Sequence, residues 1–308
     1  MFLKNFCNIG GIVVEVIILK SFTYNGNGGN GAGLVVLDKD ISEEQMQAIA
    51  ADVGLSETAF LKRIDEESFD VRFFTPICEV ELCGHATIAA FYYVGEKLIK
   101  NKIENLKLYQ NTKAGKLSIY INYKNKAVEN VLMEQASPKF YGYIDNFMNY
   151  IQNNAEQKLN IASSLGIDAS CVGLANYNIK PAIVSTGLKD ILIPVKDRQT
   201  LNEIKPQFEL ISKISEINEA VGYHVYTIDK GQIYARNFAP LVGINEECAT
   251  GTSNGALGAL LFKENIKRGY FEVLQGETMN ELSQIYVYVD ENGVKVGGKA
   301  EIVALKYL

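Results

Sequence analysis

Two segments in different halves of the 308-residue chain share one pattern, a cysteine followed by small residues and then by an apolar stretch. The first begins at Cys83 with CGHATIAAFYYV, and the second begins at Cys248 with CATGTSNGALGA. The second stretch continues through Leu260 and Phe262 and is apolar nearly all round, which is typical of a buried helix. The pattern predicts two buried helices whose amino ends carry polar groups.

The amino end of a helix favours negative charge, because its first backbone amides lack intrahelical partners and the helix dipole is positive there. Such a position binds carboxylates and lowers the pKa of a thiol. If the amino ends of the helices that start at Cys83 and Cys248 face each other, we expect them to bind a small acid between them. The duplication therefore predicts two similar halves with a carboxylate site in the cleft between them.

Composition limits the classes of partner. The chain has 47% hydrophobic and 21% charged residues, which supplies material for a large core and favours two domains over one. A net charge of −6 without a basic run argues against nucleic acid, and no apolar stretch reaches the roughly 18 residues of a membrane helix. We expect a soluble cytoplasmic protein whose five scattered cysteines are free thiols, namely Cys7, Cys78, Cys83, Cys171 and Cys248.

The first residues do not resemble a signal peptide. Gly10, Gly11 and Glu15 interrupt the early apolar run, and no small-residue cleavage site follows. Residues 1–12 are either a lead-in to a strand that starts near Val13 or a disordered leader.

Hydrophobic periodicity and turn residues predict strands around one buried helix in each half. Ser42 and Gln45 form a predicted capping box at the start of a helix that runs to about Val53. The polar stretch 123–130 marks the predicted boundary, which gives domains at 1–128 and 129–308, and the last residues are free to pack back on the first domain. We expect strands at 14–22, 33–37, 59–63, 69–74, 106–110, 116–123, 179–186, 190–194, 224–228, 232–238, 269–274, 284–289 and 295–303. We expect further helices at 84–97, 146–165 and 200–216, besides the one that follows Cys248.

Acidic residues and a histidine supply candidate proton-transfer groups. Glu57 lies in the turn LSET beside Leu55 and Phe60, where partial burial is expected to raise its pKa towards neutrality and make it a proton shuttle. The alternative is that Glu57 merely caps the turn. His85, two residues after Cys83, is either an acid or donor at the site or a structural histidine. Glu247 precedes the second helix, whose dipole stabilises its charged form.

The two thiols allow a second chemistry. If Cys83 and Cys248 lie on opposite faces of one carbon, one takes a proton and the other returns it, as in a racemase. The alternative is that both are small buried apolar groups.

The sequence does not support other common kinds of functional site. Two histidines, no CxxC pair and no HExxH motif leave little for zinc, and the glycine-rich loop NGNGGNGAG lacks the Lys-Ser/Thr ending of a P-loop. A GxSxG elbow is also missing. We predict no metal and no cofactor.

The residues resemble the phenazine biosynthesis PhzF-like family of the diaminopimelate epimerase superfamily almost from end to end. The motifs that carry the resemblance, in order, are GNGAGLVVL (29–37), LSETAFL (55–61), VRFFTPICEVELCGHATIAA (71–90), TKAGKLSI (112–119), STGLKDILIPV (185–195), RNFAPLVGINEECATGTSNGALG (236–258), QGETM (275–279) and VKVGGKAEI (294–302). The resemblance implies an α+β fold of two similar domains, each a mixed β-barrel around a central helix. It also implies an active site in the interdomain cleft and is consistent with a homodimer.

Site residues follow by position within these motifs. Glu57 matches the family's proton-transfer carboxylate, and Glu247 matches an acidic residue that is usually Asp. His85, Gly84, Asn30, Thr250, Gly251 and Thr252 match residues that line the site, and Ser56 is expected to contact the substrate beside Glu57. The resemblance implies a cofactor-free isomerase in which helix-end amides stabilise an enolate-like charge.

The sequence departs from the family pattern where Cys248 replaces the usual Pro, so that ECATG is similar to the CxTG segment of the epimerases. Residues 280–282, Asn-Glu-Leu, also replace an expected Gly-Arg-Pro.

Three functional hypotheses follow from the sequence. The first is an isomerase that shifts a proton on a small carboxylate through Glu57, with His85 and Glu247 assisting. The second is an amino-acid or imino-acid racemase that uses Cys83 and Cys248, and the third is a non-catalytic binder of a small acid.

Overall fold

The computed structural model describes residues 13–144 and 160–308, and the chain divides into two compact units. The first unit contains the residues up to Glu134 together with Gly297–Leu308, and the second contains Gln135–Val296. The last strand, β18 (Ala300–Tyr307), pairs antiparallel with the first, β1 (Glu15–Ser21), which explains why the end of the chain belongs to the first unit. The predicted leader 1–12 and most of the predicted helix 146–165 lie outside the described residues.

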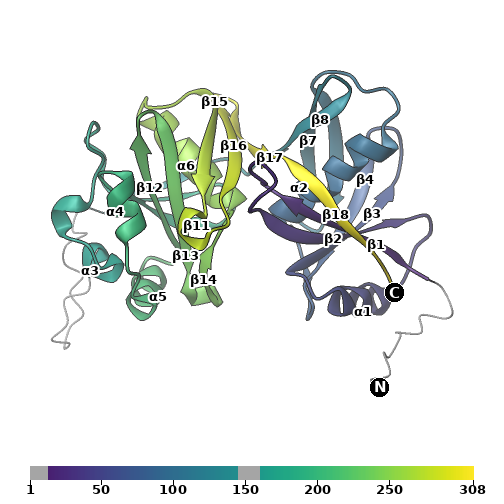
Figure 1. Ribbon diagram of the computed structural model, residues 1–308, viewed down its shortest axis with the longest axis horizontal. Helices are drawn as coiled ribbons and strands as arrows, with labels where there is room; N and C mark the ends of the chain where they lie inside the picture. The colour runs from purple at the N-terminus through teal and green to yellow at the C-terminus, as the bar shows by residue number, and fades with distance from the viewer. Residues whose placement is uncertain (1–12, 145–159) are drawn as a thin grey trace. The chain divides into compact units, whose positions relative to one another are not determined.

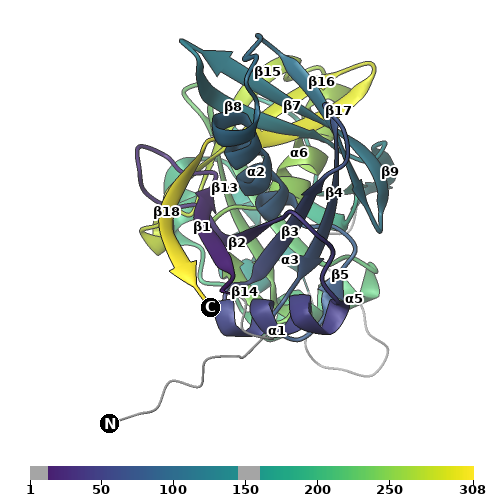
Figure 2. The ribbon, with the colours of Figure 1, turned by 90° about the vertical axis from the view of Figure 1, so that its right-hand side faces the viewer.

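The strands of the first unit surround one helix. β1 pairs with β2 (Asn30–Leu37), which runs parallel to β3 (Glu57–Arg63), and β3 pairs with β4 (Ser68–Phe74). β4 runs parallel to β6 (Leu106–Thr112) and pairs with the short β5 (Glu79–Val80), and β6 continues into the antiparallel strands β7 (Gly115–Lys124) and β8 (Ala127–Glu134). Helix α2 (Gly84–Tyr93) packs against β1, β2, β3, β7, β8 and β18 (Figures 1 and 2).

Helix α2 is buried because its side chains are small or apolar on every side. Ala86, Ala90 and Phe91 are fully buried, and the Phe91 ring meets Phe69 edge to face at 5.5 Å. The helix continues as a single π-turn, Val94–Leu98, in which a Cβ on Gly95 would lie 2.7 Å from Val128 Cγ2. The predicted buried helix at 84–97 is confirmed.

Helix α1 (Glu43–Val53) connects the parallel strands β2 and β3. Ser42 Oγ accepts from the Gln45 backbone amide, and the Gln45 side chain accepts from the Ser42 amide, so the predicted capping box is confirmed. Gly54 ends the helix in the left-handed region at φ 72°. The helix buries Ile49 against a cluster from the first strands, which fixes the β2-to-β3 connection and with it the position of Glu57.

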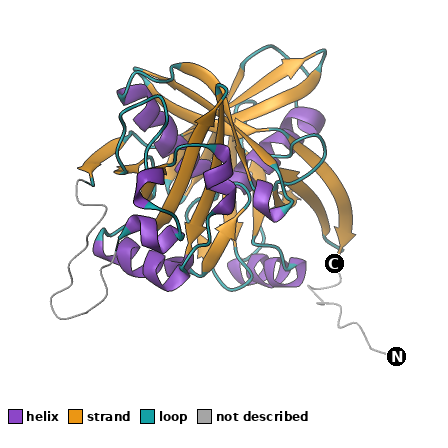
Figure 3. Cartoon of the chain, turned by 60° about the vertical axis from the view of Figure 1, so that its left-hand side comes forward, coloured by secondary structure: helices purple, strands orange, loops and turns teal. Residues whose placement is uncertain are grey.

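The second unit repeats this plan around α6 (Gly251–Lys263), which packs against β10 (Ala182–Ser185), β11 (Lys189–Pro194), β12 (Gly222–Asp229) and β16 (Ser283–Asp290). β9 (Lys139–Tyr143), β10 and β11 form an antiparallel series, and β11 runs parallel to β12. β12 pairs with β13 (Gln232–Ala239), which runs parallel to β15 (Gly269–Gln275), and β15 pairs with β16. Residues 244–247 form β14 (Ile244–Glu247) against the end of β13. The predicted α+β fold, with strands around a central helix in each half, is confirmed (Figure 3).

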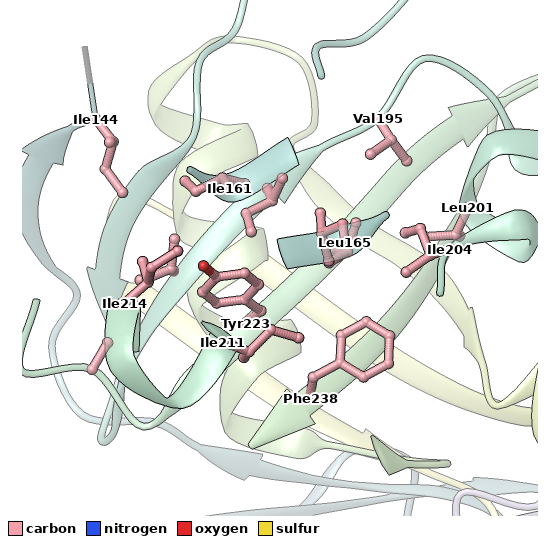
Figure 4. Packing of buried hydrophobic residues seen from close by; sticks show 14 residues of the cluster. Ile144, Ile161, Leu165, Val195, Leu201, Ile204, Ile211, Ile214, Tyr223 and Phe238 are labelled. Carbon is pink, nitrogen blue, oxygen red and sulfur yellow. The ribbon is translucent and has the colours of Figure 1, made fainter. Parts of the chain in front are cut away.

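A second core of this unit lies outside the α6 layer (Figure 4). Tyr223 and Phe238 are fully buried against α3 (Ile161–Leu165), α4 (Arg198–Glu203) and α5 (Phe208–Ile217). The prediction of one helix at 200–216 is wrong: α4 ends before Ile204, whose ψ of 128° is not helical. Pro206 explains the break, because proline has no amide hydrogen and disfavours helical geometry in the residue before it.

Two further sequence predictions differ from the structure. The polar stretch 123–130 forms the tight turn between β7 and β8, in which Asn125 and Lys126 adopt positive φ, and the first residues of β8. The predicted strand 295–303 is divided at Lys299 into β17 (Gly293–Gly298) and β18. No helix among residues 13–144 and 160–308 is long and apolar enough to cross a membrane.

Candidate active site

The first turn of α2 holds Cys83 and His85 in fixed positions. Cys83 is the residue that precedes the helix, with φ −137° and ψ 119°, and its side chain does not cap the helix. Its carbonyl accepts a 2.8 Å hydrogen bond from Thr87 Oγ1, and the His85 carbonyl accepts a 2.6 Å bond from Ser21 Oγ. These bonds anchor the backbone on both sides of Gly84. A Cβ on Gly84 would meet only Met133 Cε, at 3.8 Å, so packing does not require glycine there.

Strand β3 brings Glu57 to the same place. Glu57 is the first residue of β3, and the parallel register puts it opposite Ala32 of β2. Ser56 Oγ lies 3.4 Å from the Gly31 carbonyl, so Ser56 and Asn30, the first residue of β2, occupy the same end of this strand pair. Helix α2 packs on β2 and β3, and the contact of His85 with Glu57 places its first turn at the start of β3.

Glu57, His85 and Cys83 form one cluster. His85 Nε2 lies 3.1 Å from Glu57 Oε2 and 3.3 Å from Ser56 Oγ, and His85 Nδ1 lies 3.5 Å from Cys83 Sγ. The side chains of His85 and Glu57 are 12% and 20% exposed, so the ion pair is partly shielded from water. Four of the residues predicted for the site, Ser56, Glu57, Cys83 and His85, are therefore in contact.

The pKa of Glu57 is shifted in the direction opposite to the prediction from the sequence. Burial favours a higher pKa for Glu57, but the adjacent His85, with Ser56 and Cys83, outweighs burial and lowers the pKa below its usual value. Burial likewise favours a lower pKa for His85, but Cys83 and Glu57 raise that pKa well above its usual value. The prediction that Glu57 has a raised pKa is wrong because it took account of apolar neighbours and not of a cation.

One oxygen of Glu57 has an unused acceptor position. Oε2 is buried, and no donor among residues 13–144 and 160–308 makes an aligned hydrogen bond to it, although His85 Nε2 is within ion-pair distance. Leaving a buried polar atom without a hydrogen bond is costly. The atom is therefore a candidate to meet a group supplied by a ligand.

The start of α6 is built differently. Thr250 is the residue that precedes this helix, and Cys248 lies two positions earlier, with 9% of its surface exposed. Burial raises the pKa of Cys248, and Glu247 and Glu281 add to the effect, although Ser283 acts against it. The expectation that a helix start lowers the pKa of this thiol is therefore wrong for Cys248.

A network of neutral groups supports the segment before α6. Gln275 Nε2 donates to the Glu247 carbonyl at 2.7 Å and to Thr250 Oγ1 at 2.9 Å. Asn254 Nδ2 donates to the Thr250 carbonyl at 2.8 Å and to Gln275 Oε1 at 2.9 Å. Thr250 Oγ1 lies 3.5 Å from Glu247 Oε2. Gly251 begins the helix, and the Thr252 carbonyl accepts a 3.1 Å bond from Thr186 Oγ1.

The network continues into the core through residues that sequence analysis missed. His224 is fully buried, with Nε2 3.2 Å from Asn254 Oδ1 and Nδ1 3.3 Å from Asn237 Nδ2. Burial lowers the pKa of His224 to about 4, which keeps it neutral. Nearby, burial raises the pKa of Asp190 to about 7. Gln275 was visible within the motif QGETM, Asn254 within the small-residue turn and Asp190 within STGLKDILIPV, but His224 carries no local signal.

Comparison with solved structures gives the fold class. A probable proline racemase from Agrobacterium radiobacter matches with a TM-score of 0.61 at 12% identity, over 95% of this chain and 92% of the racemase, which shows a shared fold alone. A PhzF-family phenazine biosynthesis protein from Bacillus anthracis matches with a TM-score of 0.77 at 27% identity, over 96% of this chain and 99% of that chain. The fold is thus the one shared by these PhzF-family and proline-racemase structures.

The family follows from the sequence comparisons. The family model described as "Phenazine biosynthesis-like protein" matches residues 19–305. A protein of Clostridium acetobutylicum named as an uncharacterized isomerase is 35% identical over 301 residues, which cover 92% of this chain and 94% of the relative. The chain belongs to the phenazine biosynthesis-like (PhzF) family, as the motifs from GNGAG to VGGKA predicted, and it is an isomerase of that family.

Proposed function

We propose that the protein is a cofactor-independent isomerase that shifts a proton on a small substrate bearing a carboxylate. Glu57 removes the proton through Oε2, and the Glu57–His85 pair returns a proton to a neighbouring carbon. The observation that carries the proposal is the geometry of this pair: an ionised carboxylate oxygen, without an aligned hydrogen bond among the described residues, 3.1 Å from an imidazole nitrogen.

The pair suits proton transfer because it holds a base and an acid together. Positioned acids and bases contribute roughly 10²–10⁴-fold to such reactions. The His85 cation keeps Glu57 ionised and able to accept a proton, at the cost of making it a weaker base. The substrate must therefore be one whose carbon acid is already activated, such as a carbon next to both a carboxylate and a double bond.

The start of α2 supplies an electrophilic surface for the anion that forms. Cys83 provides no side-chain cap, so the first backbone amides of a ten-residue helix are left to other partners. Amides and a helix dipole aimed at a developing enolate lower its energy during the reaction. The substrate carboxylate or the enolate oxygen is placed at this turn, beside Gly84 and His85.

The same geometry favours a proton shift over inversion of one centre. Oε2 and Nε2 are 3.1 Å apart and belong to one unit, so they reach one face of a bound carbon skeleton. A racemase requires an acid and a base on opposite faces. Cys248 is a poor base because its pKa is raised, which weighs against a two-thiol racemase.

The test is exchange of substrate hydrogen with solvent. Proton NMR in deuterated water follows the loss of C–H signals from a panel of small amino, imino and diene acids with wild type and Glu57→Gln. The matched control is Glu96→Gln, because Glu96 is 22% exposed and ion-paired with Lys102 elsewhere in the same unit. We expect exchange in wild type and Glu96→Gln, and a loss of at least ~100-fold in Glu57→Gln.

Two results would count against the proposal. Exchange that survives in Glu57→Gln would remove Glu57 from the chemistry. If a panel acid binds to the wild-type protein, as detected by titration, but shows no exchange, the protein is better described as a non-catalytic binder of that acid.

A further inference from the structure

We propose that Glu57, Cys83 and His85 form a binding site for a thiophilic divalent cation such as Zn²⁺, and that the bound ion inhibits the enzyme reversibly. The inhibition rests on the proposed function, whereas the binding does not.

The residue types are those that bind zinc. A thiolate, an imidazole and a carboxylate each supply one ligand atom, and the three atoms lie within 4.8 Å of one another. Three protein ligands with a fourth position left for water or substrate are typical of open zinc sites. Sulfur and nitrogen ligands favour Zn²⁺, Co²⁺ or Cd²⁺ over Mg²⁺.

The distances allow the three side chains to share one ion after a rotation of the Cys83 side chain. Tetrahedral bonds of about 2.3 Å to sulfur and about 2.0 Å to nitrogen or oxygen separate sulfur from nitrogen by about 3.5 Å and nitrogen from oxygen by about 3.3 Å. The observed separations from His85 Nε2 are 3.9 Å to Cys83 Sγ and 3.1 Å to Glu57 Oε2. Glu57 therefore needs to move by only a few tenths of an ångström. Cys83 Sγ lies closer to Nδ1, at 3.5 Å, than to Nε2, so the Cys83 side chain must rotate to reach an ion on the Nε2 lone pair.

Two independent features support the site. The Oε2 atom is buried and has no aligned hydrogen bond from the described residues, so a cation would satisfy it. The backbone around the ligands is already held, because Ser21 and Thr87 bind the carbonyls of His85 and Cys83. A backbone that is held before binding limits the conformational entropy lost when the ion arrives.

Binding would stop proton transfer because the ion and the proton use the same atoms. A metal bound to Oε2 and Nε2 displaces the imidazole proton and occupies the carboxylate lone pair. The exchange reaction then loses its base and its acid together, and a chelator restores both.

Cobalt provides a direct readout on the full-length reduced protein. Co²⁺ bound to a thiolate gives a near-ultraviolet charge-transfer band, and we expect this band to saturate at one ion per chain. Cys83→Ser should lose the band, and Cys83→Asp should bind Co²⁺ without it, which separates loss of a ligand from loss of fold. Glu57→Gln and His85→Gln should each weaken binding at least ~10-fold.

The other cysteines supply matched controls. Cys78→Ser and Cys248→Ser should keep the band. A band that survives in Cys83→Ser, disappears in either control, or fails to form in a large excess of Co²⁺ would overturn the site. Mg²⁺ should neither compete with Co²⁺ nor slow exchange.

Inhibition is tested separately, by adding Zn²⁺ to the wild-type exchange assay and then a chelator. We expect exchange to stop and to return. Exchange that is unaffected by Zn²⁺ while the cobalt band is present would overturn the inhibition alone. A cobalt band in a protein that exchanges no substrate would leave the metal site standing and overturn the proposed function, and the inhibition with it.

Discussion

At the start of α2, a carboxylate, an imidazole and a thiol lie within 4.8 Å of one another, and the carboxylate and imidazole are charged. At the start of α6, the groups that hold the chain are amides and hydroxyls, the histidine behind them is neutral, and the thiol has a raised pKa. Both segments have a cysteine before a small-residue turn and a buried helix. The neighbours that each unit supplies surround the same motif with charged groups in one place and with neutral hydrogen-bonding groups in the other.

A helix start alone does not set the chemistry of a thiol. Cys83 immediately precedes α2 and has a histidine two residues later. Cys248 lies two residues further from its helix, and its acidic neighbours, Glu247 and Glu281, disfavour a thiolate. The helix dipole is a modest effect confined to the first turn, and burial with like charge exceeds it.

The largest effect is expected from the replacement of His85, which should lower the rate of solvent exchange. His85→Gln removes the cation that keeps Glu57 ionised and the donor that lies 3.1 Å from it. We expect solvent exchange to fall at least ~100-fold. Lys102→Gln breaks an ion pair of similar exposure in the same unit and should leave exchange unchanged. A fall in the rate of exchange of less than threefold in His85→Gln would show that the charged cluster does not transfer the proton.

Replacement of Gln275 tests the supporting role of the second helix start. Gln275 is fully buried and makes three side-chain hydrogen bonds, to Glu247, Thr250 and Asn254. Gln275→Ala should lower the free energy of unfolding by about 3 kcal/mol, because it leaves buried partners unsatisfied.

The matched amide is Gln199, whose exposed side chain donates a hydrogen bond to the exposed Glu203 side chain. Gln199→Ala should change the free energy of unfolding by less than about 0.5 kcal/mol. Equal effects of the two substitutions in denaturant titrations would show that the network does not stabilise the unit.

Protonation of His224 should make the second unit sensitive to acid. The unfolded histidine binds a proton below its ordinary pKa of 6.5, whereas the folded one remains neutral until about pH 4. The unfolded state therefore gains protons first, and the free energy of unfolding falls as pH falls through this window. The loss from this residue is about 2 kcal/mol between about pH 7 and about pH 5.

His224→Gln should remove that part of the pH dependence. Denaturant titrations of the two proteins at several pH values provide the measurement. Parallel stability profiles for wild type and variant would contradict the buried neutral histidine.

The smallest expected effect is a difference in alkylation rate between two cysteines. Cys248 is buried and has a raised pKa, while Cys78 is exposed. Iodoacetamide should modify Cys248 at least ~10-fold more slowly than Cys78, because the thiolate is the reacting form. Peptide mass spectrometry over time provides the rates. Equal rates would restore Cys248 as a candidate base.

Local signals in the sequence predicted much of the fold. The capping box at Ser42 and the hairpin from β6 to β7 depend on neighbouring residues, and the two buried helices follow from uniformly apolar stretches. The break between α4 and α5 was also readable, because Pro206 lies within the predicted helix. Family resemblance supplied Glu57 and His85 as site residues.

The electrostatics could not be predicted in this way. Glu57 meets His85 only because the parallel pairing of β2 and β3 brings the start of β3 to the first turn of α2. Without that contact, burial suggests a raised pKa for Glu57, and the sign of the shift is wrong. His224 and Asn237 become neighbours through the antiparallel register of β12 and β13, which no short motif encodes.

We propose that the charged cluster at α2 transfers the proton and that Cys248 does not. The most direct test is the steric course of deuterium incorporation, measured by NMR on an exchanging acid with wild type, Glu57→Gln and Cys248→Ser. We expect Cys248→Ser to keep exchange and to give the same product as wild type, and Glu57→Gln to lose exchange. Inversion of the substrate centre by wild type, with exchange lost in Cys248→Ser and kept in Glu57→Gln, would contradict the proposal.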